Sequence, residues 1–116
     1  MLKEKKVTKW MLKSKFDEFQ EAAMSTAIYP SNKALEYTAL GLASEAGEFA
    51  GKVKKWIRDG HIDDKLAAHE LGDCLWYIAA AAEALGYDLS EIADLVLNKL
   101  KDRKERNVIS GSGDER

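Results

Sequence analysis

The chain has 116 residues, the size of one domain, and its 46% hydrophobic and 33% charged residues are typical of an ordinary globular protein. Its 18 basic and 20 acidic residues give a net charge near -2, which argues against a nucleic-acid polymer as the main partner. Because no stretch has the length of a membrane span or the apolar core of a secretory signal, and the single cysteine cannot form an internal disulfide, we expect a cytoplasmic protein with no membrane partner.

Hydrophobic periodicity predicts four helices, and so an all-α, four-helix bundle-like domain over residues 1–106. The helices are expected over about 8–27, 33–58 and 64–85, and from the Gly86–Glu91 junction to about 106. Residues 107–116 are rich in Gly and Ser, and they predict a flexible tail.

Local signals mark the ends of these helices. Pro30, the only proline, cannot continue a helix, and Ser31 or Asn32 is expected to cap the second one. Asp63 is expected to cap the third helix. The phrase Asp88-x-x-Glu91 resembles a capping box for the fourth, with Ser90 as a rival cap.

Two short acidic motifs share the pattern acid, any residue, glycine, acid: Glu45-Ala46-Gly47-Glu48 and Glu70-Leu71-Gly72-Asp73. On a helix, the three-residue step puts both carboxylates of a motif on one face, one turn apart. If the second and third helices form an antiparallel hairpin with these faces inward, four carboxylates converge, and they stay ionised only beside cations. Magnesium, or manganese in its place, prefers such oxygen ligands. The alternative is solvated surface, because acid pairs arise easily in so acidic a chain.

Gly47 and Gly72 occupy the same place in the two motifs. A glycine inside a helix costs roughly 1 kcal/mol relative to alanine, so something should offset that cost. We expect that these glycines let the backbone approach another helix or a ligand where a side chain would block it.

Basic residues follow the first acidic motif along the second helix. Lys52, Lys54 and Lys55 are candidates for contacting the phosphates of a ligand whose other phosphate oxygens bind the metal. The alternative is a solvated basic end that complements the helix dipole.

Nine uncharged residues, 74–82, follow Asp73 directly. They cover every face of a helix, so we expect this segment to be enclosed on nearly all sides, with Asp73 at its edge. A carboxylate held there needs a metal, a base or a hydrogen-bond donor. Tyr77 lies one turn beyond Asp73 on the same face and is a candidate ligand contact. Trp76 points elsewhere, as a core residue or subunit contact, and Cys74 is interpreted as a buried small hydrophobe.

The last predicted helix carries a polar row at near-helical spacing, formed by Asn98, Lys99 and Arg103. This row is placed to contact a phosphate or the metal. The alternative for Lys99 and Arg103 is plain solvated surface.

Together these residues resemble the MazG-like nucleotide pyrophosphohydrolases of the all-α NTP pyrophosphatase superfamily. The family pattern is Glu-Glu-x-x-Glu, a spacer, then Glu-x-x-Asp, and here it is Ser44–Glu48, a spacer of 21 residues, and Glu70–Asp73. Other matching phrases are Leu40-Gly41-Leu42, Leu75-Trp76-Tyr77 and Asn98-Lys99-Leu100 with Arg103. The likeness covers roughly residues 16–106. Ser44 departs from the pattern, because the family usually has Glu there.

The resemblance implies metal-dependent hydrolysis of nucleoside triphosphates, ribo- or deoxyribo-, to the monophosphate and pyrophosphate, in house-cleaning or control of the nucleotide pool. It makes Glu45, Glu48, Glu70 and Asp73 the metal ligands and catalytic residues, with Glu48 as the candidate outer-shell base. It also assigns Asn98, Lys99 and Arg103 to nucleotide or phosphate binding. Because the family forms dimers or tetramers, a homodimer or homotetramer is expected.

Two other functions stay open at this point. A phosphoribosyl-ATP pyrophosphohydrolase would share the metal chemistry and differ in its substrate. A helical adaptor or regulatory dimer would use its acidic residues only for solubility, and would gain no thermal stability from magnesium.

Overall fold

The computed structural model describes residues 14–116, and its regular structure is entirely helical. A short 3-10 helix, Ser31–Lys33, precedes the longest of the four α-helices. The α-helices are α1 Lys15–Met24, α2 Ala34–Asp59, α3 Asp64–Leu85 and α4 Leu89–Glu105. The described residues form no strand, which confirms the all-α prediction. Residues 8–13 of the predicted first helix lie outside the described part of the chain.

The predicted start of α3 is confirmed. The Asp63 carboxylate accepts a hydrogen bond from the Leu66 backbone N–H at 3.1 Å, as an N-cap residue does. The capping box of α4 is also confirmed, because the Asp88 backbone N–H donates to Oε1 of Glu91 at 3.0 Å. These two local signals fix where both helices begin.

The predicted cap of α2 is wrong. Ser31 and Asn32 form part of the 3-10 helix, and Lys33 precedes α2 without a side-chain capping bond. A 3-10 turn of this kind satisfies backbone groups at a helix start without a capping side chain.

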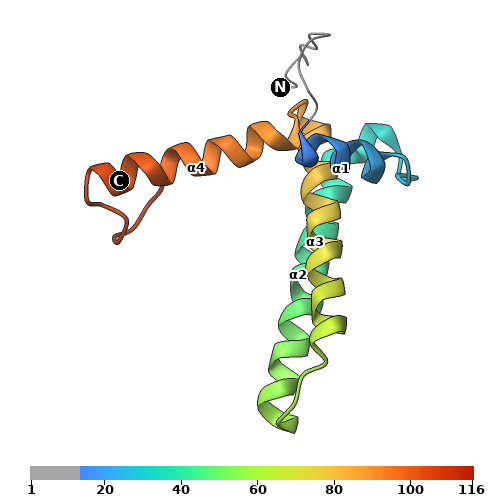
Figure 1. Cartoon of the computed structure of the whole chain (residues 1–116). Helices are drawn as coiled ribbons and strands as arrows, with labels where there is room; N and C mark the ends of the chain where they lie inside the picture. The colour runs from blue at the N-terminus through green and yellow to red at the C-terminus, as the bar shows by residue number, and fades with distance from the viewer. Residues whose placement is uncertain (1–13) are drawn as a thin grey trace.

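Helices α2 and α3 form a long antiparallel hairpin, in which they lie side by side along their whole length (Figure 1). Gly41 of α2 permits the closest approach, because a Cβ atom there would lie 2.1 Å from a carbon of the Tyr77 ring. A Cβ at Gly47 or Gly72 would meet nothing within 4 Å. The expected close contact at these two glycines is therefore absent within the described chain, and Gly41 makes it instead.

Helix α1 crosses the open end of the hairpin and anchors the junction between α3 and α4 (Figure 1). The Gln20 side chain, which is 3% exposed, donates to the carbonyls of Ala79 at 3.3 Å and Tyr87 at 3.0 Å. It also accepts from the Leu89 N–H at 2.9 Å. A buried amide satisfied at both ends fixes the direction in which the chain leaves α3.

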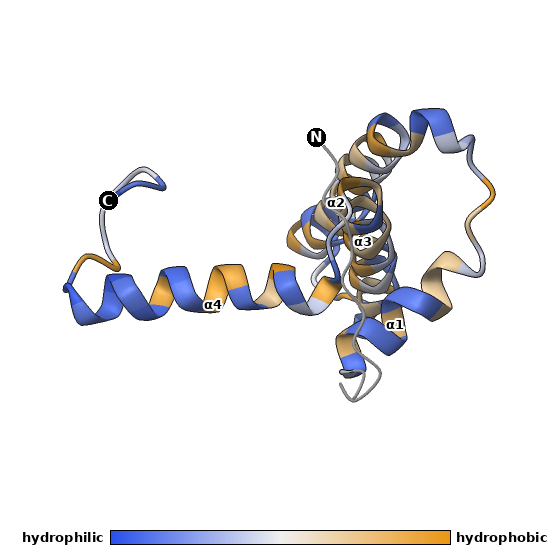
Figure 2. Cartoon of the chain, turned by 90° about the horizontal axis from the view of Figure 1, so that it is seen from above, coloured by the Kyte–Doolittle hydropathy of each residue, from blue (hydrophilic) through white to orange (hydrophobic). Residues whose placement is uncertain are grey.

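Helix α4 leads away from the hairpin at a steep angle (Figure 1). Its first turns are packed, with Leu89 in a small core with Ala23 and Ala79, and near its other end Arg103 is buried beside Asp114 of the C-terminal segment. Between these two ends, its apolar residues are exposed, and Figure 2 shows them in the middle of the helix. The exposed apolar residues of α4 are Leu95, Val96, Leu97 and Leu100.

The predicted enclosure of residues 74–82 holds for the second half of the segment only. Ala79, Ala80 and Ala82 are buried, whereas Leu75 is 40% exposed and Cys74 is only partly buried. The first half is only partly covered in the described chain, where α4 leads away from the hairpin and does not return along it (Figure 1). None of the helices in residues 14–116 is long and apolar enough to cross a membrane.

Candidate metal centre

Three carboxylates meet across the seam of the hairpin. Glu45 comes from α2, and Glu70 and Asp73 come from α3; one oxygen of each lies within 4.8 Å of the others. Ligand oxygens around an octahedral magnesium ion lie about 3 to 4 Å apart, so small rotations of these side chains would bring them to that spacing. The donor set, three carboxylates at a partly exposed position, fits a hard divalent cation with room for water.

Glu48 does not join this group. Its side chain is exposed, and it lies outside the three-acid cluster. A three-residue step turns a helix by about 300°, so Glu48 sits roughly 60° around α2 from Glu45, whereas Lys52, seven residues on, returns to within about 20°. Four carboxylates were predicted to converge, and in the structure three of them do. The fourth, Glu48, lies at the exposed edge of the cluster.

The electrostatics of Glu45 reflect its position in this cluster. Partial burial raises the pKa of the Glu45 carboxyl, and the negative charges of Asp73, Glu70 and Glu48 raise it further, together with a hydrogen bond to Glu70. Each of these effects disfavours the ionised acid. A bound cation would instead favour the ionised carboxylate, so the charges of this cluster would be stabilised by a cation.

Lys52 forms an ion pair with one of the three acids. Its Nζ lies 3.8 Å from Oε1 of Glu70, and their side chains are 32% and 15% exposed. The other two predicted phosphate contacts are placed less favourably. Lys54 is exposed, and Lys55 lines, together with Lys52, a pocket of about 190 Å³ that reaches to the closed end of the hairpin. Of the three lysines, the structure brings only Lys52 to the acids.

A pocket of about 300 Å³ opens beside the cluster and is lined by Glu45, Asp73, Trp76 and Tyr77. Tyr77 thus lies beside Asp73, and its predicted contact with a ligand stays a prediction. Trp76 was expected only in the core or at a subunit contact. It does pack against the small core, and its indole N–H donates to Oγ1 of Thr26 at 3.0 Å, but its ring also forms a wall of the pocket.

Two further tyrosines, Tyr29 and Tyr37, extend the aromatic wall, and the sequence reasoning missed both. Their rings stack with centroids 4.9 Å apart. Tyr29 meets the Trp76 ring edge-on at 6.3 Å, and Tyr37 lies 6.4 Å from Tyr77. One signal was available, because Tyr37 lies four residues before Gly41 and so shares its helix face. Flat aromatic surfaces of this kind stack on nucleobases.

The polar row of α4 is not brought to the acids within one chain. Asn98 is exposed, and Lys99 and Arg103 contact Asp114 of the C-terminal segment instead. Any contribution of this row to the metal centre requires α4 of another copy.

The fold and site together define an all-α protein with a carboxylate cluster suited to a divalent cation, next to an aromatic pocket. The chain belongs to the MazG nucleotide pyrophosphohydrolase domain family, whose model matches residues 33–108. It is 49% identical over 112 residues to the "Gene 37 protein" of Mycobacterium phage L5, an alignment that covers 86% of this chain and 97% of that relative. No solved structure matches the chain.

Proposed function

We propose that the protein hydrolyses nucleoside triphosphates, ribo- or deoxyribo-, to the monophosphate and pyrophosphate, with magnesium as its cofactor and manganese as a substitute. The observation that carries this proposal is the cluster of Glu45, Glu70 and Asp73 at the edge of an aromatic pocket, in a chain of the MazG family. In this reaction water adds to the α phosphorus, and the bond from that phosphorus to the oxygen bridging to the β phosphate breaks. Such an activity fits house-cleaning or control of the nucleotide pool.

Glu45, Glu70 and Asp73 would hold the cation. When bound, the ion would polarise phosphate oxygens and lower the pKa of a bound water. Glu48, at the rim and outside the three-acid cluster, is the carboxylate that remains to orient the attacking water or to accept its proton.

The remaining residues bind and orient the substrate. Lys52 lies against Glu70 and carries the positive charge closest to the cluster, so it would face the phosphates. Trp76 and Tyr77 line the adjoining pocket, where a nucleobase or ribose would pack against their rings. Lys55 shares a pocket with Lys52, but neither it nor Lys54 forms an ion pair with the three acids in the described part of the chain.

We further propose that the working form is a homodimer or homotetramer. The support is the large exposed apolar surface of α4, where Leu95 is 58% and Leu97 is 61% exposed. Apolar residues grouped in this way mark an interaction surface. A second copy would cover them, and it would offer its own Asn98, Lys99 and Arg103 to the site of the first.

The test is a panel of nucleotides with magnesium, in which released pyrophosphate is measured against orthophosphate. We expect pyrophosphate from one or more ordinary nucleoside triphosphates. Release from phosphoribosyl-ATP alone would reassign the substrate. No release from any nucleotide, together with no thermal stabilisation by millimolar magnesium, would favour a helical adaptor.

A further inference from the structure

The C-terminal segment, residues 107–116, folds back on the end of α4 through defined turns. Asn107 has a left-handed φ of 56°, and the Val108 N–H donates to the carbonyl of Arg103 at 2.8 Å, which closes α4 and reverses the chain. Gly113 has a φ of 84°, which side-chain-bearing residues rarely adopt. The Gly and Ser residues that suggest flexibility therefore also make turns.

Arg106 and Arg116 hold this segment in place through hydrogen bonds to its backbone carbonyls. The Arg116 guanidinium donates to the carbonyls of Val108 at 3.0 Å, Ile109 at 2.9 Å and Gly113 at 2.6 Å. Arg106 in turn donates to the Arg116 carbonyl at 2.7 Å. The segment is thus fixed by its own contacts, and these contacts determine where its acidic residues lie.

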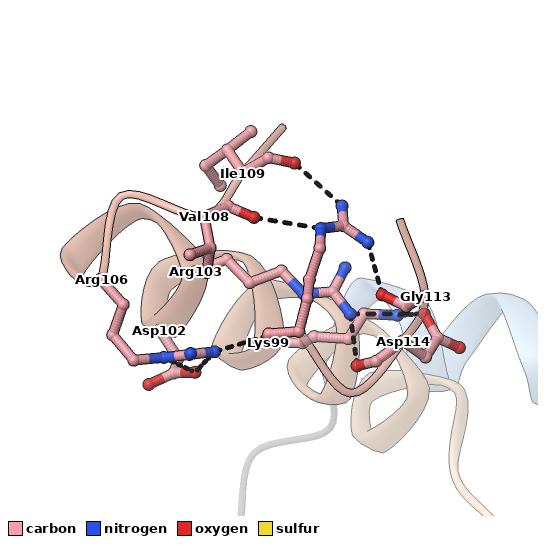
Figure 3. A network of polar contacts seen from close by, with 9 residues as sticks. Lys99, Asp102, Arg103, Arg106, Val108, Ile109, Gly113 and Asp114 are labelled. Carbon is pink, nitrogen blue, oxygen red and sulfur yellow. Dashed lines mark hydrogen bonds and ion pairs between the residues drawn. The ribbon is translucent and has the colours of Figure 1, made fainter. Parts of the chain in front are cut away.

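Asp114 lies directly against the two cations of the polar row (Figure 3). Its Oδ1 is 3.3 Å from Nζ of Lys99 and 3.4 Å from the Arg103 guanidinium, which also donates to the Asp114 carbonyl oxygen at 2.5 Å. Arg103 is only 4% exposed. Hydrogen bonds from Lys99 and Arg103 lower the pKa of Asp114, so its carboxylate stays charged at neutral pH.

A carboxylate held between a lysine and an arginine occupies the position that a phosphate group would take, because the same donors recognise both kinds of anionic oxygen. The Asp114 side chain is itself 85% exposed, so it can leave without disturbing a core. We propose that the C-terminal segment is an autoinhibitory latch, in which Asp114 occupies the Lys99–Arg103 pair and must be displaced before a phosphate-bearing ligand binds there. The latch rests on the proposed function in so far as that ligand is the nucleotide substrate.

Competition between Asp114 and a phosphate-bearing ligand should change the apparent dissociation constant of that ligand by a measurable factor. The apparent dissociation constant of a ligand is divided by the fraction of molecules whose site is free, so removing the latch should tighten binding by roughly threefold to tenfold if it is closed most of the time. The ion pairs are partly exposed, so added salt should reduce the difference.

The experiment compares Asp114→Asn with Glu115→Gln in the full chain. Both changes remove one negative charge from neighbouring positions, but Glu115 forms no ion pair with Lys99 or Arg103. Calorimetry with inorganic pyrophosphate in the absence of divalent metal measures the anion site without activity. We expect several-fold tighter binding by Asp114→Asn and less than a twofold change for Glu115→Gln. Adding Lys99→Ala to Asp114→Asn should remove the gain.

Each outcome separates the latch from the proposed function. Equal pyrophosphate affinity in the two single variants would overturn the latch, and so would a lower melting temperature of Asp114→Asn with unchanged affinity, because that pattern means a structural role. Tighter binding by Asp114→Asn, with no pyrophosphate released from any nucleotide, would keep the latch as an anion switch and reject the hydrolase. If turnover is present, the latch further predicts a lower KM for Asp114→Asn, with a similar kcat.

Discussion

The hairpin and α4 both have periodic apolar patterns, but the two helices of the hairpin pack against each other within the chain and α4 leaves most of its pattern exposed. In the hairpin, α2 and α3 turn their seams toward each other, and the seam holds the carboxylate cluster and the Gly41–Tyr77 contact. Helix α4 has an equally periodic apolar pattern, yet within one chain it leaves most of that pattern exposed. The residues of the carboxylate cluster meet within one chain, whereas the described chain leaves most of the apolar surface of α4 uncovered.

The largest effect should come from the cluster itself. Asp73→Asn removes a charged ligand from the three-acid cluster, and we expect at least a hundredfold loss of magnesium-dependent turnover together with loss of magnesium-induced thermal stabilisation. The helical circular-dichroism spectrum should stay largely unchanged. Glu48→Gln should also abolish turnover if Glu48 is the base, but should keep the magnesium stabilisation. If both variants lost the stabilisation equally, Glu48 would be a ligand after all.

A second prediction tests whether α4 is an interface. Leu97 is 61% exposed in one chain, so its replacement by a charge should cost little in an isolated protomer but should dissociate an oligomer that buries it. We expect both Leu97→Glu and Leu97→Lys to lower the assembled fraction about tenfold or more in sedimentation at micromolar concentration. Dissociation by only one of the two charges would indicate electrostatic repulsion rather than a buried apolar contact.

A third prediction compares two glycines of α2. Gly41→Ala places a methyl 2.1 Å from the Tyr77 ring, so we expect the free energy of unfolding to fall by about 1 to 3 kcal/mol in urea titration. Gly47→Ala meets nothing in the described chain and should raise it by roughly 0.5 to 1 kcal/mol through helix propensity. A destabilising Gly47→Ala would show that another copy packs against that face.

The smallest effect concerns pH. The pKa of Glu45 is raised in the folded protein, so the native state holds a proton that the unfolded state has already released. Without divalent metal, the free energy of unfolding should therefore fall as pH rises from the ordinary glutamate range through the raised pKa. Melting curves from about pH 4 to pH 7 in EDTA should show this slope. Magnesium or Glu45→Gln should flatten it, and an unchanged slope in Glu45→Gln would assign the effect to other groups.

The parts of the fold that depend on local chemistry could be predicted from the sequence. The bounds of α3 agree with the prediction because Asp63 and Gly86 are signals carried by the adjoining residues themselves. The direction of α4 could not be predicted in the same way. It depends on Gln20, a residue of α1 that binds backbone groups nearly 60 and 70 positions away, and nothing in its own neighbourhood indicates those partners.

The candidate site shows the same division. The acidic motifs could be predicted because a step of three residues is close to a helical repeat, but in α2 only Glu45 joins the cluster, whereas in α3 both Glu70 and Asp73 do. Which acids converge depends on how the two helices face each other, and the motifs alone do not determine that. The angle of Trp76 on the predicted third helix indicates a core residue or a subunit contact. In the pocket wall Trp76 contacts Thr26 and Tyr29, two residues of the connection between α1 and α2 that lie far from it in sequence.

The ion pair between Lys52 and Glu70 gives the hairpin a monovalent counter-charge of its own. With no divalent ion bound, one of the three acids is therefore already compensated from within the chain. If a divalent ion bound Glu70, the Lys52 ammonium would lose this partner and could pair with an anion beside the site. A single lysine would then compensate the empty cluster and, after the ion binds, attract the ligand.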